Sequence, residues 1–277
     1  MSTPMSAGSS ERVGGAPKVD VFGVGLSVTD YESATAQIIA AAAGRRSFGV
    51  TALATHGLME AAGDPVFRRK VNELDLVAPD GQPVRWAMNA LHGTGLDERV
   101  YGPDLVGHVC ARAEREQVSV YLYGSTPQTC EAFVAALGRR FPRLVIADVQ
   151  PDRFRDATPE ERRADIERIN GSGAGVVLVG RGCPRQERWV HDHLGEVHAA
   201  MLAVGAAFDY HAGMLRRPPA WMQRHGLEWL FRLVQEPRRL WRRYLVHNAR
   251  FLLAFAAAYA RRVGAGFRND AASTRSG

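Results

Sequence analysis

The chain has few cysteines and no long hydrophobic run, and each shortage excludes a class of protein. Its three cysteines, Cys110, Cys130 and Cys183, lie far apart and form no CxxC pair. This argues against a structural zinc site and favours a reducing compartment. The longest apolar segment, residues 251–260, is about half of the roughly 20 residues that span a bilayer. We therefore expect no transmembrane helix. No complete GxGxxG motif follows Gly23 and Gly25, so we infer no dinucleotide site.

Acidic residues are scarce in one segment, residues 216–262, which holds eleven arginines against Glu228 and Glu236 and so carries +9. The whole chain carries +6 and residues 263–277 carry +1, which leaves −4 on residues 1–215. Such asymmetry predicts an anionic partner: a membrane surface, nucleic acid or a phosphorylated substrate. Trp, Tyr and Leu recur at helical spacing between these arginines, a pattern typical of helices that lie in the membrane interface.

The length of 277 residues fits one large α/β domain with an appendage, or two small domains. Residues 1–18 are rich in Ser, Gly, Pro and Ala without an apolar core, so we expect a disordered leader, not a secretory signal. We predict an α/β catalytic domain over 19–215, a basic amphipathic helical appendage over 216–262 and a disordered tail over 263–277.

Short apolar runs alternate with helical patterns along residues 19–215, which predicts an α/β, Rossmann-like, mainly parallel sheet covered by helices. Thr158 and Glu161 form a capping box at the start of one such helix. The strands are expected at residues 19–24, 48–53, 75–78, 118–123, 144–149, 176–179 and 199–204.

The run Val176–Val179 indicates a strand that is buried on both faces. It ends in a turn with Gly180 and Gly182, and Pro184 then opens a helix whose first turn contains Gln186 and Glu187. A glycine turn before a helix leaves backbone N–H groups free, an arrangement that suits a diphosphate.

Four turns follow predicted strands: residues 79–81, 124–127, 180–184 and 205–209. Open α/β sheets bind ligands at this edge. Asp80, between Pro79 and Gly81, is either a general base for an attacking hydroxyl or the cap of a turn or helix.

The other candidates also have two interpretations each. Gly124 and Ser125 either cradle phosphate or simply begin a helix, and Arg85 and Arg99 either bind phosphate or are solvated. Asp209 either binds a sugar hydroxyl or caps a turn.

Cys183 is either a nucleophile or a small buried residue, and His56 either lines the site or has a packing role. His191 and His193 are two residues apart, so on a helix they diverge and do not chelate one metal.

Seven ordered blocks of sequence resemble the WecG/TagA/CpsF glycosyltransferases, family 26 of the glycosyltransferases, over about residues 20–250. They are DPVFR (64–68), DLVAPDGQPV (75–84), ERVYGPDL (98–105), YLYGST (121–126), GRGCPRQERW (180–189), VGAAFDYHAG (204–213) and RRPPAWMQRHGLEWLFRLVQEPRRLWRRYL (216–245).

The resemblance implies an inverting, metal-independent transfer of a sugar from a UDP-sugar to a polyprenyl-diphosphate-linked saccharide, in cell-surface polysaccharide synthesis. It also implies a peripheral protein at the cytoplasmic face of the membrane, bound to anionic lipid through residues 216–262. No cofactor, metal or nucleic acid is expected, and the absence of a DxD motif agrees with metal independence.

Within this family Asp80 matches the proposed base, and appendage arginines are thought to reach the diphosphate. The candidate substrate-binding residues are Thr51, Thr55, His56, Arg99, Gly124, Ser125, Gly180, Gly182, Gln186, Glu187, Asp209, Arg217, Arg224, Arg232 and Arg238.

One block departs from the family pattern. Members usually carry a TxN motif after the second strand, whereas residues 51–56 here read TALATH and lack the asparagine. Either Thr55 or His56 substitutes for it, or the donor sugar differs.

Two functions other than glycosyl transfer fit part of the sequence. A non-catalytic protein that binds a membrane surface or nucleic acid explains the basic segment but gives no purpose to the four turns. A nucleotide-dependent oxidoreductase lacks the full glycine fingerprint.

Overall fold

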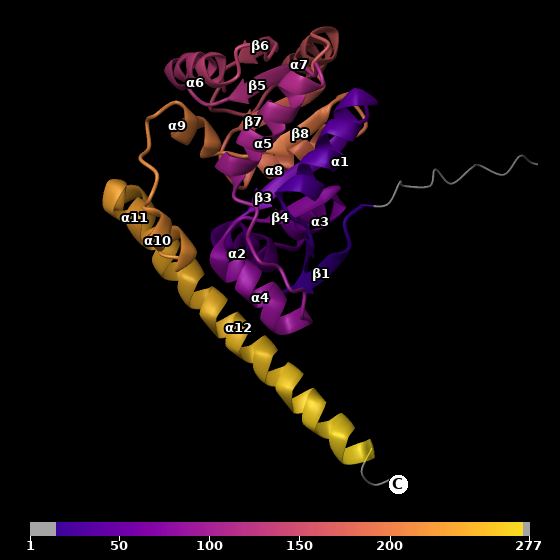
Figure 1. The fold of residues 1–277 in the computed structure, drawn as a ribbon, viewed down its shortest axis with the longest axis vertical. Helices are drawn as coiled ribbons and strands as arrows, with labels where there is room; N and C mark the ends of the chain where they lie inside the picture. Colours follow the sequence, from indigo (N-terminus) through magenta and orange to yellow (C-terminus); the bar gives the residue numbers. More distant parts are fainter. Residues whose placement is uncertain (1–14, 274–277) are drawn as a thin grey trace, which may run out of the picture.

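The computed structural model describes residues 15–273, with side chains through residue 264. Six strands form one parallel sheet in the order β4-β3-β8-β7-β5-β6, with helices on both faces (Figure 1). The predicted mainly parallel, Rossmann-like fold is therefore confirmed. The strands are β3 (Phe48–Leu53), β4 (Leu76–Pro79), β5 (Val120–Gly124), β6 (Ile146–Gln150), β7 (Val176–Gly180) and β8 (Ala200–Ala203).

The helices that cover the sheet begin close to the residues that the capping and proline signals predicted. The Thr158 and Glu161 capping box is present, because each side chain accepts a hydrogen bond from the other residue's backbone N–H. These helices are α1 (Tyr31–Ala43), α2 (Thr55–Gly63), α3 (Pro65–Glu73), α4 (Gln82–His92), α5 (Gly102–Arg115), α6 (Pro127–Arg140), α7 (Pro159–Gly171), α8 (Arg185–Asp192) and α9 (Ala207–His211).

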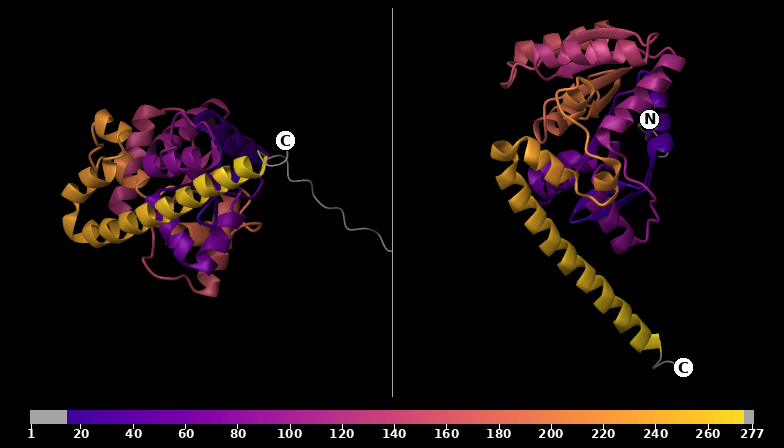
Figure 2. Two further views of the ribbon diagram at one scale, coloured as in Figure 1. Left: turned by 90° about the horizontal axis from the view of Figure 1, so that it is seen from below. Right: turned by 60° about the vertical axis from the view of Figure 1, so that its left-hand side comes forward.

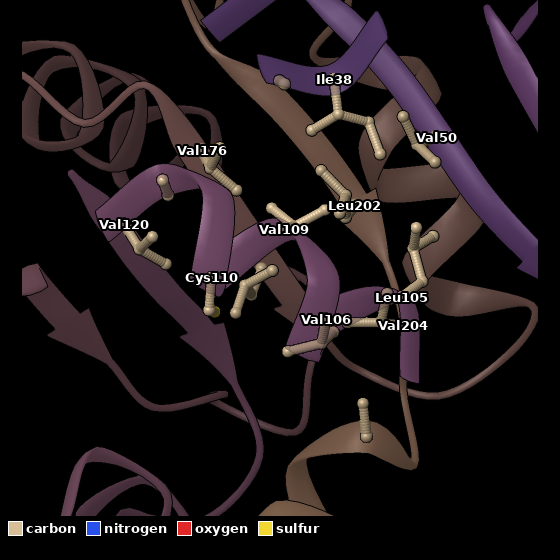
Figure 3. Packing of buried hydrophobic residues seen from close by; sticks show 14 of the residues in the cluster. Ile38, Val50, Leu105, Val106, Val109, Cys110, Val120, Val176, Leu202 and Val204 are labelled. Carbon is tan, nitrogen blue, oxygen red and sulfur yellow. The ribbon is translucent and has the colours of Figure 1, made fainter. Parts of the chain in front are cut away.

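Strand β7 is buried on both faces, as its continuous apolar sequence predicted. Val176 and Leu178 belong to a core shared with α1, α5 and α6, part of which Figure 3 shows. Val177 and Val179 point the other way, into a second core with α2, α3, α4 and α8. Each fully buried side chain of this kind stabilises the fold by about 1.5–3 kcal/mol relative to exposure. The sheet edge that follows β7 is thus held on a rigid base.

The first predicted strand, residues 19–24, is wrong in one respect: the segment is an antiparallel hairpin of β1 (Lys18–Val21) and β2 (Val24–Ser27). Phe22 and Gly23 form its two-residue turn, with φ of 58° and 86°. Positive φ at both positions matches the twist of hairpin strands. Phe22 lacks the usual preference for this conformation, so the turn carried no clear sequence signal.

Residues 216–273 contain α10 (Ala220–Arg224), α11 (Glu228–Gln235) and the long α12 (Pro237–Ser273). Helix α12 packs on α2 and α4 and then extends beyond the body (Figures 1 and 2). None of the described helices is both long and apolar enough to cross a membrane.

Helix α12 continues to Ser273, so residues 263–273 are helical where we predicted a disordered tail from 263. No proline follows Pro237, and the glycines at 264 and 266 weaken a helix by only about 1 kcal/mol each, so neither residue type stops it. Of the predicted disordered leader over 1–18, residues 1–14 lie outside the described residues, as do 274–277, and β1 begins at Lys18.

Candidate active site

One cavity of about 760 Å³ opens at the carboxyl edge of the sheet. Its walls include residues that follow β3, β4, β5, β7 and β8, together with residues of α11 and α12. All four predicted turns contribute to it, because the carboxyl ends of parallel strands meet at one edge. The appendage closes the side of the cavity that faces away from the sheet.

Asp80 lies at the end of β4, and its backbone is fixed by neighbouring strands and loops. Its N–H donates to the Leu53 carbonyl at 3.3 Å. Helix α4 begins after Gly81 with no side-chain cap, so Asp80 does not serve as the cap of α4. A Cβ atom on Gly102 would lie 3.7 Å from Asp80 Oδ2, which shows how closely the first turn of α5 approaches the carboxyl group.

The surroundings of Asp80 oppose its ionisation near neutral pH. The pKa of this carboxyl is raised to about 7, chiefly by burial and also by the Glu228 carboxylate. Arg99, the Gly102 backbone N–H and Arg232 act in the opposite direction. A carboxyl group with this pKa is ionised in part of the molecules at pH 7 and accepts a proton readily, as a general base requires.

Arg99 joins the body to the appendage. Its guanidinium makes a two-pronged ion pair with Glu228 of α11, and the two side chains are only 8% and 14% exposed. The same guanidinium lies 4.4 Å from the centroid of the Tyr101 ring. Arg99 lines the cavity, but its charge is matched by Glu228 and is not left free for phosphate.

The two glycine turns close on one another. Gly124 has φ of +117°, and a Cβ there would lie 2.6 Å from the Gly180 carbonyl oxygen. The Ser125 N–H donates to that oxygen at 2.8 Å, and the Gly182 N–H donates to Gln186 Oε1 at 3.1 Å. These two N–H groups, which we expected to be free for a diphosphate, already have protein partners. Ser125, Gly180 and Gly182 line the cavity, whereas Gly124 does not.

Gln186 and Glu187 form a buried polar network beneath the glycine turn. Thr51 Oγ1 and Gln186 Nε2 donate to Glu187 Oε1 at 3.2 and 2.9 Å. Burial raises the pKa of Glu187. Gln186 and Glu187 reach the cavity wall, while Thr51 is fully buried behind it and not among the lining residues. The network holds the turn in place.

Only one of the four predicted appendage arginines lines the cavity. Arg232 does, and its guanidinium lies 5.8 Å from the Tyr210 ring centroid. Arg217 pairs with Asp104 at 2.5 Å, and neither Arg224 nor Arg238 is among the lining residues.

Sequence reasoning missed Arg239 and Arg243, which line the cavity instead. Arg239 and Arg243 are four residues apart on α12, but Arg238 and Arg242 have the same spacing, so the sequence alone does not single them out.

Three further predicted residues, Thr55, His56 and Asp209, line the cavity. Burial lowers the pKa of His56 well below its usual value, helped by Arg243, so this imidazole is neutral. Burial raises the pKa of Asp209, against the nearby charges of Arg232 and Arg239.

The surroundings of Arg85 and Cys183, the remaining candidates, favour a structural role for each. Arg85 lies outside the cavity and donates to the carbonyls of Leu96 and Asp97 at 2.7 Å. Cys183 lines the cavity, but burial raises the pKa of its thiol well above the usual value, which makes a poor nucleophile. Among the described residues, no cluster of three or more His, Cys, Asp and Glu side chains is placed to hold a metal ion.

These features define a class: a Rossmann-like α/β protein with a deep cavity at its strand ends, closed by a helical appendage. The family model described as the Glycosyl transferase WecG/TagA/CpsF family matches residues 19–264. The match includes both the sheet and the appendage that line the cavity. The chain therefore belongs to the WecG/TagA/CpsF family of glycosyltransferases, as its sequence blocks predicted.

Proposed function

We propose that this glycosyltransferase moves a sugar from a UDP-sugar to a hydroxyl group of a polyprenyl-diphosphate-linked saccharide, with inversion and without a metal ion. The product would be an intermediate of a cell-surface polysaccharide. The observation that carries this proposal is the placement of Asp80, with its pKa near 7, in one cavity with Arg232, Arg239 and Arg243.

Asp80 acts as the general base. Its carboxylate takes the proton of the acceptor hydroxyl while that oxygen attacks the anomeric carbon of the donor sugar. The bond from the anomeric carbon to the UDP oxygen breaks on the opposite face, and UDP leaves with the electron pair. Base catalysis of this kind typically contributes about 10²–10⁴-fold.

Arg232, which projects from α11, supplies positive charge where UDP gains negative charge. Arg239 and Arg243 of α12 are left for the diphosphate of the acceptor, and Glu236 pairs with both Arg232 and Arg239. Arg99, whose charge is matched by Glu228, has a different role in this scheme: it holds the appendage over the cavity.

Binding at the cytoplasmic membrane surface belongs to the same proposal. The appendage carries +9 over residues 216–262. On α12, the exposed apolar side chains include Trp241, Leu245, Leu252 and Leu253. Each arginine near an anionic surface contributes about 1 kcal/mol, and apolar insertion adds to this.

The test is a panel of UDP-sugars against lipid-diphosphate-linked acceptors, with the product identified by mass. We expect one donor to give product and Asp80→Asn to reduce turnover by about 10²-fold or more. Absence of any UDP release with every donor would favour the non-catalytic membrane or nucleic-acid binding protein instead. Near wild-type turnover by Asp80→Asn would remove Asp80 from the role of base.

A further inference from the structure

The cavity has two chemically different ends. The end at the strand edge is charged and contains Asp80 together with Arg232, Arg239 and Arg243. The other end lies between α4 and α12, and its side chains are almost all apolar. They are Pro83, Trp86 and Ala87 from α4, and Phe251, Leu252 and Phe255 from α12.

Helix α12 shows the same change along its own length. The residues that it places in the cavity are first Arg239 and Arg243, then Tyr244 and Asn248, and then Phe251, Leu252 and Phe255. Four of the six steps between these positions are three or four residues and two are single steps, so together the residues form one broad helix face. With a rise of 1.5 Å per residue, Arg243 and Phe251 lie about 12 Å apart along the axis. One face of the helix thus passes from cationic to apolar.

We infer that the groove between α4 and α12 binds the isoprenoid chain of a prenyl diphosphate, with the diphosphate at Arg239 and Arg243. The identity of this amphiphile rests on the proposed function, and the groove assigns a place to its hydrocarbon chain. The position of the first isoprene units would then set the distance between the acceptor hydroxyl and Asp80.

The exposed apolar surface of two side chains favours a hydrocarbon chain over a second sugar in this groove. Trp86 is 42% exposed and Leu252 is 64% exposed, so both offer apolar surface to a ligand. Burial of that surface is favourable, at roughly 25 cal/mol per Å². A sugar would leave hydroxyl groups without partners against these side chains.

A row of aromatic side chains continues outward along α12 from the apolar end of the cavity. Rings of Phe251, Phe255 and Tyr259 follow one another, with centroid separations of 6.3 and 5.9 Å. This row leads toward the exposed part of the helix. A chain that enters from a bilayer would meet these apolar side chains first, and then Asn248 and Tyr244 before the arginines.

The test uses the full-length protein without membranes and compares the binding of farnesyl diphosphate, dimethylallyl diphosphate and inorganic pyrophosphate by calorimetry. We expect the farnesyl compound to bind at least about tenfold more tightly than the dimethylallyl compound, because it buries more CH₂ groups. Trp86→Ala and Leu252→Ala should each reduce this chain-length ratio severalfold and leave pyrophosphate affinity unchanged.

Leu253→Ala is the matched control. Leu253 is the next residue of α12 and is 73% exposed, but it is not among the cavity-lining residues. We expect it to keep the wild-type ratio. Equal affinities for the two prenyl compounds, or the same loss in both leucine variants, would overturn the inference. Chain-dependent binding without sugar transfer would instead contradict the proposed function and leave the groove assigned.

Discussion

At the scale of single residues, Asp80 combines a reactive position with a stability cost. Its pKa is raised from 3.8 to about 7, so the folded protein binds this proton more tightly than the unfolded chain does. Below pH 4 Asp80 is protonated in both the folded and the unfolded protein, so its raised pKa costs no stability. Between pH 4 and 7 the unfolded state ionises first, and the folded state loses up to about 4 kcal/mol of relative stability. Above pH 7 the loss stays constant.

Asp80→Asn should therefore stabilise the protein at high pH. We expect its melting temperature to equal that of the wild type at pH 4 and to exceed it by several degrees at pH 8. Differential scanning calorimetry from pH 4 to 9 measures this, with Asp104→Asn, at a half-buried position, as the control. A lower melting temperature for Asp80→Asn at pH 8 would contradict the burial argument.

Glu228 offers a second prediction at the same scale. Its carboxylate raises the pKa of Asp80 and also pairs with Arg99, which lowers that pKa. In Glu228→Gln one negative charge is gone and the Arg99 charge is no longer matched, so both changes favour ionised Asp80. The acidic limb of the kcat/KM profile should move to lower pH, by about one unit.

The control for this variant is again Asp104→Asn, which removes a carboxylate from the exposed body–appendage ion pair with Arg217. Its pH profile should match the wild type. An unmoved acidic limb in Glu228→Gln would mean that Glu228 does not influence the base.

At the scale of elements, the close approach of β5 and β7 determines the cavity floor. A Cβ on Gly124 would lie 2.6 Å from the Gly180 carbonyl oxygen, so a side chain at 124 must push the two strand ends apart. Gly124 also has a φ that L-residues rarely adopt.

Gly124→Ala should therefore destabilise the protein by about 2 kcal/mol or more and reduce activity as well. Gly138→Ala, in α6 with no atom near the added Cβ, should be neutral or slightly stabilising. Urea unfolding of both variants measures the difference. Equal stabilities would show that the strand ends separate without strain.

The elements are encoded by neighbouring residues, whereas parts of the site depend on contacts between residues far apart in the sequence. The buried run of β7, the capping box of α7 and the turn containing Asp80 depend on neighbouring residues, and all three were predictable. The Arg99–Glu228 pair joins positions 129 residues apart, and it depends on how α11 docks. No local period encodes that docking. For the same reason Arg239 and Arg243 escaped notice, whereas Arg217 and Arg238 were expected in the cavity.

The N–H groups of the glycine turns show the same limit of local sequence. The glycines correctly predict unusual backbone angles, because Gly124 and Gly182 both have positive φ. Whether its donors are free depends on distant partners, here the Gly180 carbonyl and the Gln186 side chain.

At the scale of the whole molecule, charge and apolar exposure both concentrate on the appendage. We expect the protein to sediment with anionic vesicles, less with neutral ones, and less at high salt. Leu245→Ser, on the exposed side of α12, should weaken this binding severalfold. Val66→Ser, an equally exposed position of α3 on the body, should not. Equal binding to neutral and anionic vesicles would contradict the role of the arginines.

The cavity wall formed by α11 and α12 comes from residues 228–255, within the last fifth of the chain. All six strands of the sheet precede it, so a nascent chain can assemble its sheet before the wall has left the ribosome. A stop codon before residue 228 would give a polypeptide with the sheet but without the wall that carries Arg232, Arg239 and Arg243. The enclosed cavity therefore forms only after residues 228–255 have been synthesised and have docked beside the sheet.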